Sequence, residues 1–244
     1  MKILLNGACG RMGSEVERLV IASDSNEIAA RVDKMADGNG CFASISDFDG
    51  EADMIIDFSN HLGTAELLNY AVKRKLPVVI ATTGHTDDEL KMIEDAAKKT
   101  AVFHSANMSL GVALLVELAV KTAAVMPDAD IEIVETHHNR KLDAPSGTAL
   151  MIANAIKKVR EKAEFKLGRA GSVKREKSEI GIHAVRRGNI VGIHEVLVST
   201  DSQTITLKHE AHSRALFAEG AISAAEFLLG KPAGLYDMNS IISG

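Results

Sequence analysis

The first hundred residues alternate short apolar runs with longer amphipathic segments. The apolar runs predict strands over 2–6, 27–33, 53–58, 77–81 and 101–104. Between them, apolar residues that recur every three to four positions predict helices. These helices cover 11–23, 61–74 and 86–99. Strands of about four to six residues that alternate with helices of about twelve are typical of parallel βαβ units. The pattern therefore predicts an α/β fold with a doubly wound parallel sheet.

The pattern changes near residues 106–110. A helix predicted over 109–126 ends at a proline, and a strand over 130–136 leads into the polar loop 137–146. A second helix is predicted from 146 to 163, followed by an exposed basic loop over 164–178. Three strands without intervening helices and a last helix complete the chain: 180–186, 190–199, 203–209 and 213–229. The alternation in the last two strands is typical of antiparallel strands with one solvated face. We therefore expect a second domain with a different sheet.

Composition and charge argue against a nucleic-acid-binding, membrane or disulfide-rich protein. The chain has 244 residues, with 28 Lys and Arg against 33 Asp and Glu, which gives a formal net charge of −5. A mildly acidic chain has no global electrostatic attraction to nucleic acid or to an anionic membrane. No apolar run approaches the ~18–20 residues of a membrane span. The two cysteines form no disulfide framework. We expect a cytoplasmic protein that binds neither nucleic acid nor membrane.

A glycine-rich loop joins the first predicted strand to the first predicted helix. It reads GACGRMG over 7–13. Glycine permits a tight turn and lets a pyrophosphate approach the helix N-terminus, where free N–H groups and the helix dipole favour anions. The spacing is G-x-x-G-x-x-G rather than the usual G-x-G-x-x-G, so the strand–loop–helix context carries the assignment. The loop predicts a dinucleotide site.

Two charged residues with opposite preferences end the second predicted strand. Asp33 lies 20 residues beyond Gly13, where an acidic side chain accepts hydrogen bonds from the adenosine ribose and repels a 2′-phosphate. Lys34 follows directly, and its ammonium can attract that phosphate. The pair leaves both NADH and NADPH open as cofactors, with a slight lean to NADH.

The segment 135–149, ETHHNRKLDAPSGTA, concentrates chemically active groups. Four basic side chains lie within five residues: His137, His138, Arg140 and Lys141. Such groups are costly to place together unless they are solvated or used. Ser146 is a good N-cap for the helix that follows, and the helix N-terminus favours anions. Basic side chains beside a helix N-terminus form a cradle that fits a carboxylate substrate.

Neither metal binding nor serine hydrolysis is supported by this segment. Adjacent histidines point in different directions, no HExxH or His-x-His spacing occurs, and the remaining histidines are scattered. Ser146 does not lie in a G-x-S-x-G elbow. We expect no metal site.

Motifs along the whole chain resemble the dihydrodipicolinate reductase family, whose activity is also called 4-hydroxy-tetrahydrodipicolinate reductase. The string HHxxKxDAPSGTA is the most specific of them. The matching motifs are GACGRMG at 7–13, ATTG at 81–84, SANMS at 105–109, E-x-HHNRKLDAPSGTA at 135–149, IGIHAVRRGNIVGIHEV at 180–196 and GLYDM at 234–238. The likeness therefore runs essentially from end to end.

The resemblance implies an oxidoreductase that uses NADH or NADPH. It would reduce 4-hydroxy-tetrahydrodipicolinate to tetrahydrodipicolinate in lysine and diaminopimelate biosynthesis. It implies a dinucleotide-binding Rossmann-type domain formed by 1–108 and 215–244. A smaller α+β domain with a mixed sheet, 109–214, would bind the dicarboxylate substrate and form the oligomer, which in this family is typically a homotetramer.

The resemblance also assigns roles to single residues. His137 and Lys141 would be the catalytic pair, and which of them donates the proton stays open. His138, Gly147 and Thr148 would bind the substrate. The cofactor would contact four segments: Gly7, Ala8, Cys9, Gly10, Arg11 and Met12; Asp33 and Lys34; Ala81, Thr82 and Thr83; and Ser105, Ala106, Asn107 and Met108. The family often has glycine where Ala81 stands and phenylalanine where Met108 stands.

Two other functions share part of the pattern. A short-chain dehydrogenase or epimerase also begins with G-x-x-G-x-x-G but needs Tyr-x-x-x-Lys. Neither Tyr70 nor Tyr236 has a lysine four residues further on. A non-catalytic NAD(H)-binding redox sensor would need a partner or DNA-binding element, and it would leave the segment 137–148 without a role. Turnover of the substrate separates the reductase from the sensor.

Overall fold

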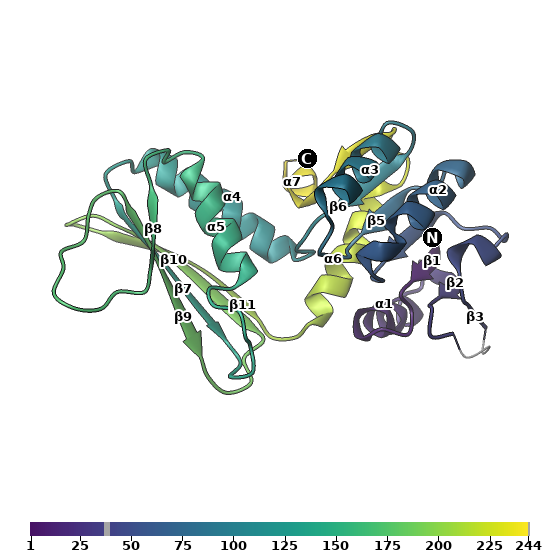
Figure 1. Ribbon diagram of the computed structural model, residues 1–244, viewed down its shortest axis with the longest axis horizontal. Helices are drawn as coiled ribbons and strands as arrows, with labels where there is room; N and C mark the ends of the chain where they lie inside the picture. Colours follow the sequence, from purple (N-terminus) through teal and green to yellow (C-terminus); the bar gives the residue numbers. More distant parts are fainter. Residues whose placement is uncertain (37–39, 244) are drawn as a thin grey trace. The chain divides into compact units, whose positions relative to one another are not determined.

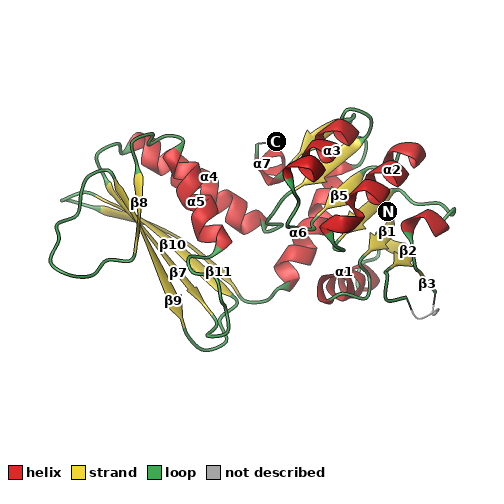
Figure 2. Ribbon diagram, viewed as in Figure 1, coloured by secondary structure: helices red, strands yellow, loops and turns green. Residues whose placement is uncertain are grey.

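The computed structural model describes residues 1–36 and 40–243, and the chain divides into two compact units. The first unit combines Met1–Ser109 with Ala215–Gly244, and the second is Leu110–Arg214. Each unit has its own sheet, as Figures 1 and 2 show. In the described part of the chain, no helix has both the length and the apolar character to cross a membrane.

The first unit is built on a parallel sheet of seven strands. Their order is β12-β6-β5-β4-β1-β2-β3, and every neighbouring pair is parallel. The strands are β1 (Lys2–Asn6), β2 (Glu27–Val32), β3 (Cys41–Phe42), β4 (Met54–Asp57), β5 (Val78–Ile80), β6 (Ala101–His104) and β12 (Gly234–Tyr236). The order reverses between β1 and β4. In such sheets ligands bind at this switch point, outside the carboxyl ends of the strands.

Helices cover both faces of this sheet. The pair α1 and α6 packs together, and so does the pair α2 and α3 (Figure 1). The helices are α1 (Arg11–Ile21), α2 (Thr64–Arg74), α3 (Asp87–Ala97), α6 (Ala215–Leu228) and α7 (Met238–Ile242), with 3-10 turns η1 (Ile45–Asp47) and η2 (His61–Gly63). Ile3, Leu4 and Leu5 of β1 are fully buried, because consecutive side chains face opposite helical layers.

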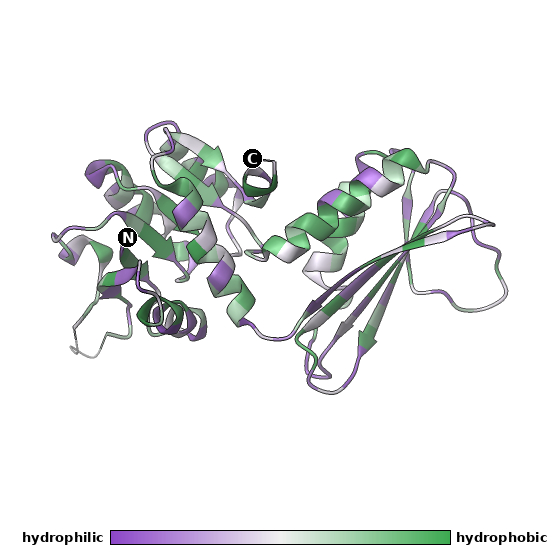
Figure 3. Ribbon diagram, turned by 180° about the vertical axis from the view of Figure 1, so that it is seen from behind, coloured by the Kyte–Doolittle hydropathy of each residue, from purple (hydrophilic) through white to green (hydrophobic). Residues whose placement is uncertain are grey.

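The second unit has a mixed sheet of five strands in the order β11-β10-β7-β9-β8. Both β11 and β7 run antiparallel to β10, whereas β9 runs parallel to β7 and β8. The elements are α4 (Leu110–Val125), β7 (Asp130–His137), α5 (Gly147–Lys157), β8 (Glu164–Leu167), β9 (Glu179–Arg186), β10 (Gly192–Ser199) and β11 (Thr204–Ala211). Hydrophobic residues dominate α4 and α5, whereas the strands carry both kinds (Figure 3). These two units confirm the predicted fold class.

One predicted helix end is wrong. The helix expected over 146–163 ends at Lys157. Arg160 turns away and donates hydrogen bonds to the carbonyls of Ala123 and Met126, at the end of α4. Carbonyls of a helix's last turn lack partners within the helix, so this guanidinium satisfies them. Tertiary hydrogen bonds here outweigh the helix propensity of the sequence.

Several short elements lie outside the sequence predictions. The loop expected over 164–178 begins with the strand β8, which pairs with β9 from Glu164 opposite Glu179 to Leu167 opposite Ile182. The sequence analysis also does not predict β3, β12 or α7. Elements of two to five residues are too short to show a period of their own.

Candidate active site

The glycine loop follows the carboxyl end of β1 and is closely packed. Gly7 has φ +81°, and a Cβ on it would lie 2.6 Å from the carbonyl group of Phe58. A Cβ on Gly13 would lie 2.2 Å from the Gly7 oxygen. The N–H groups of Gly7 and Ala8 donate to the Val32 oxygen, at 2.8 and 3.1 Å. Side chains at the two outer glycines would therefore displace backbone.

The N-terminus of α1 fits an anionic group. Gly10 is its N-cap, with no side-chain cap and no acidic residue in the first turn. Cys9, Gly10 and Arg11 are exposed, and Met12 is half-buried. Exposed backbone N–H groups at a helix N-terminus are suited to a dinucleotide pyrophosphate.

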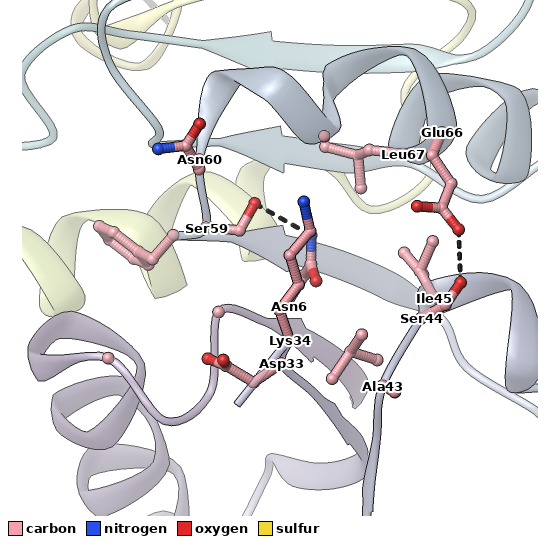
Figure 4. A pocket seen from close by; sticks show the side chains of 15 residues that line it. Asn6, Asp33, Lys34, Ala43, Ser44, Ile45, Ser59, Asn60, Glu66 and Leu67 are labelled. Atoms are coloured by element: carbon pink, nitrogen blue, oxygen red, sulfur yellow. Dashed lines mark hydrogen bonds between the residues drawn. The ribbon is translucent and has the colours of Figure 1, made fainter. Parts of the chain in front are cut away.

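Asp33 lies beside this loop at the end of β2 (Figure 4). Its carboxylate accepts hydrogen bonds from the N–H groups of Cys9 at 3.0 Å and Met35 at 2.8 Å. Lys34 is exposed. Asp33 therefore braces the glycine loop, and no sequence motif predicts this bracing role.

A cavity of about 260 Å³ opens at the switch point (Figure 4). Four residues predicted to bind cofactor line it: Gly7, Gly10, Asp33 and Lys34. Ser44, Ser59 and Glu66 also line it, and no sequence motif marks them. The Glu66 carboxylate accepts hydrogen bonds from the hydroxyls of Ser44 and Ser46. The cavity thus combines two carboxylates with one ammonium.

Asp57, at the end of β4, ties three strand ends together. It is 1% exposed and accepts hydrogen bonds from Asn6 Nδ2 at 2.7 Å, Ser59 Oγ at 2.6 Å and Thr82 Oγ1 at 2.7 Å. Burial raises the pKa of the Asp57 carboxyl, and these hydrogen bonds oppose the rise. No role of Asp57 is predicted from the sequence, although a charged residue that ends the otherwise apolar strand β4 is a signal that could have pointed to it.

The remaining predicted cofactor residues follow β5 and β6. Ala81 and Thr82 are buried, whereas Thr83 and Ala106 are exposed. The Ser105 hydroxyl donates to the Asn107 oxygen at 2.8 Å, which folds this segment into a tight turn. Met108 is only 3% exposed. This position therefore offers little side-chain surface to a nicotinamide ring.

In the second unit, Glu135 lies at the centre of a buried hydrogen-bond network at the end of β7. It is 0% exposed, and its oxygens accept four hydrogen bonds. The donors are His137 Nδ1 at 2.5 Å, the Ser146 N–H at 3.0 Å, and Arg186 Nη1 and Nη2 at 2.7 and 2.8 Å. Burial raises the pKa of the Glu135 carboxyl, but the hydrogen bonds from Arg186 and His137 outweigh burial and hold it below its usual range.

The ring of His137 packs against a second buried histidine. The ring centroids of His137 and His194 are 5.2 Å apart, with an interplanar angle of 73°. His194 Nε2 lies 3.2 Å from the Ser146 hydroxyl. Burial, together with the neighbouring His137, lowers the pKa of His194 to about 4. A Cβ on Gly192 would lie 3.1 Å from His137 Nε2, so this glycine leaves room for the ring.

The loop after β7 carries Lys141. Its Nζ lies 2.9 Å from Asp143 Oδ1, and this contact lowers the pKa of the Asp143 carboxyl. The Asp143 carbonyl accepts from Arg186 Nη2 at 2.7 Å, and the His138 N–H donates to the Ile190 oxygen at 2.8 Å. Burial, followed by the charge of Arg140, lowers the pKa of His138. The loop backbone is therefore anchored, while the exposed Asp143 carboxylate can release the ammonium to a substrate.

The N-terminus of α5 completes this group. Ser146 is the N-cap, and its Oγ accepts from the Ala149 N–H at 3.2 Å. Gly147 is exposed, Thr148 is half-buried, and the first turn carries no acidic residue. The second unit carries all five residues predicted to act on the substrate on one segment, from the end of β7 to the first turn of α5: His137, His138, Lys141, Gly147 and Thr148. A carboxylate fits beside these groups.

Three members of this network, Glu135, Arg186 and His194, have no role predicted from the sequence. Glu135 stands two residues before His137 on a strand, so both face the same side of the sheet, and this spacing was the available signal. Arg186 and His194 come from β9 and β10, and no local pattern links them to β7. Among the described residues, no group of three or more His, Cys, Asp and Glu side chains could hold a metal ion.

Comparisons with known proteins agree over the whole chain. The model of the dihydrodipicolinate reductase N-terminus matches residues 1–108, and that of the C-terminus matches 111–242. The 4-hydroxy-tetrahydrodipicolinate reductase of Caldanaerobacter subterraneus subsp. tengcongensis is 46% identical, over 99% of this chain and 98% of that protein. The enzyme of the same name from Clostridium novyi is 44% identical over the same shares.

A solved structure supports the fold. The dipicolinate-bound dihydrodipicolinate reductase from Paenisporosarcina sp. TG-14 aligns over 98% of both chains with a TM-score of 0.85, at 24% sequence identity. The structural likeness at 24% identity shows the fold alone. The two family models and the identities of 46% and 44% over nearly the full length show the family. The chain belongs to the dihydrodipicolinate reductase family, the NAD(P)H-dependent 4-hydroxy-tetrahydrodipicolinate reductases of lysine and diaminopimelate biosynthesis.

Proposed function

We propose that the first unit binds the dinucleotide and that the β7–α5 segment of the second unit carries the proton transfer and substrate binding. The observation that carries this proposal is the buried Glu135 carboxylate, which bonds both His137 and the N-cap of α5, with Lys141 and its partner Asp143 in the loop between them. Such an arrangement offers a proton donor beside a site for a carboxylate.

The reaction adds a hydride and a proton to the substrate and releases its 4-hydroxyl group as water. The bound nicotinamide supplies the hydride from its C4 atom. Lys141 or His137 donates the proton, and a general acid contributes a factor of about 10²–10⁴ in rate. His138, the backbone N–H groups of Gly147 and Thr148, and the Thr148 hydroxyl hold a substrate carboxylate. All the residues proposed to act on the substrate therefore lie on one continuous segment, 137–148.

Turnover tests the proposed function directly. Dihydrodipicolinate synthase generates the unstable substrate in the assay, and oxidation of NADH is followed by absorbance. We expect NADH oxidation that depends on both the synthase and this protein. Binding of NADH without turnover in this assay would favour the redox sensor.

Loss of the Thr148 hydroxyl should weaken dicarboxylate binding. Pyridine-2,6-dicarboxylate should compete with the substrate, and Thr148→Val should weaken its binding by about 1–3 kcal/mol, the typical cost of losing a hydrogen bond to a charged group. Thr122→Val is the matched control, because the Thr122 hydroxyl bonds only its own helix, to the Leu118 oxygen at 2.7 Å, among the described contacts. Inhibition that competes with NADH alone and is unchanged in Thr148→Val would place the anion site elsewhere.

Opposing charges at the adenosine end should leave both cofactors usable. Asp33, with Glu66 in the same cavity, disfavours a 2′-phosphate, whereas Lys34 attracts it. Each exposed charge contributes about 1 kcal/mol or less. We therefore expect NADH and NADPH to differ in kcat/KM by less than about 10-fold, which corresponds to about 1.4 kcal/mol, with a lean to NADH.

Salt resolves which charge dominates this choice. Added salt should shift the kcat/KM ratio toward NADH if the Lys34 attraction dominates, and toward NADPH if the Asp33 repulsion does. Lys34→Ala isolates the first effect. A preference above about 100-fold for either cofactor would contradict the expected balance.

We also propose that the protein is a homotetramer in the cytoplasm. The homotetramer rests on the family resemblance. The packing of α4 and α5 against one side of the mixed sheet, and the exposure of most of β11, support an assembly through the other side.

A further inference from the structure

We propose that Glu135, with its charge balanced by Arg186, is the positioning residue that fixes the tautomer and the protonation of His137. This role of Glu135 rests on the proposed function, since it requires His137 to take part in proton transfer.

The hydrogen bonds around Glu135 leave one arrangement for the proton on His137. The Arg186 guanidinium and the Ser146 N–H can only donate, so they fix the Glu135 oxygens as acceptors. His137 Nδ1, 2.5 Å from Oε2, must then be the donor. A neutral imidazole has one donor and one acceptor nitrogen. The nitrogen of His137 that gains and loses a proton is therefore Nε2.

Arg186 balances the charge of the buried Glu135 carboxylate. Its guanidinium donates two hydrogen bonds to the two carboxylate oxygens, so the carboxylate beside the His137 ring has its own cation. Besides Glu135, the titratable groups that interact with His137 are His194 from β10 and His138 from the loop, and His209 from β11 and Lys141 act in turn on His194. Burial lowers the pKa of His194 to about 4, so this neighbour stays neutral near pH 7.

The same carboxylate links His137 to the anion cradle. The Ser146 N–H that donates to Glu135 belongs to the N-cap of α5, directly before Gly147 and Thr148. Glu135 therefore orients the proton donor and the start of the substrate-binding helix through one buried group. A change at this residue should affect kcat and the protonation of His137, and not only the stability of the fold.

Nuclear magnetic resonance on the full-length protein tests the tautomer without any substitution at Glu135. With ¹⁵N-labelled histidine, and with His137→Gln to identify the signals, neutral His137 should carry its proton on Nδ1. A neutral ring with its proton on Nε2 would overturn the proposal, even if the Glu135 and Arg186 variants failed to fold.

Two substitutions should shift the protonation of His137 in opposite directions. Glu135→Gln removes the anion that stabilises the imidazolium, so the ring should lose its proton at a pH about 1 unit lower. Arg186→Met leaves that anion unbalanced, so the ring should lose its proton about 1 unit higher. Arg186→Lys keeps the charge but not the bidentate geometry, so its shift should be smaller.

The value of kcat and its pH dependence should change together with the protonation of His137. Glu135→Gln should lower kcat at least about 10-fold, because a misoriented general acid loses part of a contribution of about 10²–10⁴. When a general acid must be protonated, activity falls as pH rises through its pKa. The alkaline limb of the pH profile should therefore move to lower pH in Glu135→Gln and to higher pH in Arg186→Met.

Glu132→Gln is a matched control on the same strand. Glu132 also accepts hydrogen bonds from an arginine and a histidine, Arg175 Nε at 3.0 Å and His183 Nε2 at 2.8 Å. This variant should leave kcat and the His137 titration unchanged. Shifts in the same direction for Glu135→Gln and Arg186→Met, or equal shifts in Glu132→Gln, would overturn the proposal. Unchanged turnover in His137→Gln would instead remove His137 from the proposed proton transfer and leave Lys141 as the candidate, while the tautomer of His137 still tests Glu135.

Discussion

Replacement of Lys141 by alanine is expected to lower kcat at least about 100-fold while NADH binding is retained. The substitution removes an ammonium proposed as general acid, whose contribution is about 10²–10⁴. The loop backbone is anchored by the Arg186–Asp143 and His138–Ile190 hydrogen bonds, so the loss should reflect chemistry more than folding. Stopped-flow or steady-state measurement of kcat, with NADH titration by fluorescence, checks both halves of the prediction.

Two further substitutions test whether the loss of kcat in Lys141→Ala is specific to proton transfer. Lys158→Ala, at an exposed lysine at the end of α5, controls for loss of a positive charge and should leave kcat near that of the unchanged protein. His138→Ala should act mainly on KM, because His138 is proposed to bind the substrate carboxylate. Near-normal kcat in Lys141→Ala would remove Lys141 from the proton transfer and leave His137 as the candidate.

The sequence predicts the parts of the site that come from one continuous segment. The glycine loop follows β1 directly, and the residues from His137 to Thr148 share a single strand–loop–helix unit. Strand and helix periods, N-cap preferences and glycine spacing all act over a few residues, so they are visible without tertiary structure.

The sequence does not predict groups that meet only in three dimensions. Arg186 reaches Glu135 because β9 pairs with β7 in parallel, and the register places Arg186 opposite His137. Asp57 receives its hydrogen bonds from residues that end β1 and follow β5. The strand β8 exists through its pairing with β9. The Arg186–Glu135 contact, the Asp57 hydrogen bonds and the strand β8 all depend on strand order and register, which local sequence patterns do not encode.

Replacement of Gly13 by alanine is expected to disrupt the glycine loop from within. The new Cβ would lie 2.2 Å from the Gly7 oxygen and 2.7 Å from Ala8 Cα, and both are backbone atoms without rotamers. Overpacking of this kind costs about 1–3 kcal/mol of folding free energy. Because Gly7 and Ala8 shape the dinucleotide cradle, NADH should also bind more than about 10-fold more weakly, a loss above about 1.4 kcal/mol.

Gly10→Ala separates loop packing from approach of the cofactor. Gly10 has φ −73°, and a Cβ on it would meet only the Gly7 oxygen, at 3.2 Å, among the described atoms. This variant should therefore keep most of its thermal stability yet still bind NADH more weakly, because a methyl group would stand where the pyrophosphate approaches the helix N-terminus. Thermal unfolding and NADH titration of both variants test the difference. If Gly10→Ala and Gly13→Ala both bind NADH as tightly as the unchanged protein, the pyrophosphate is not held by this loop.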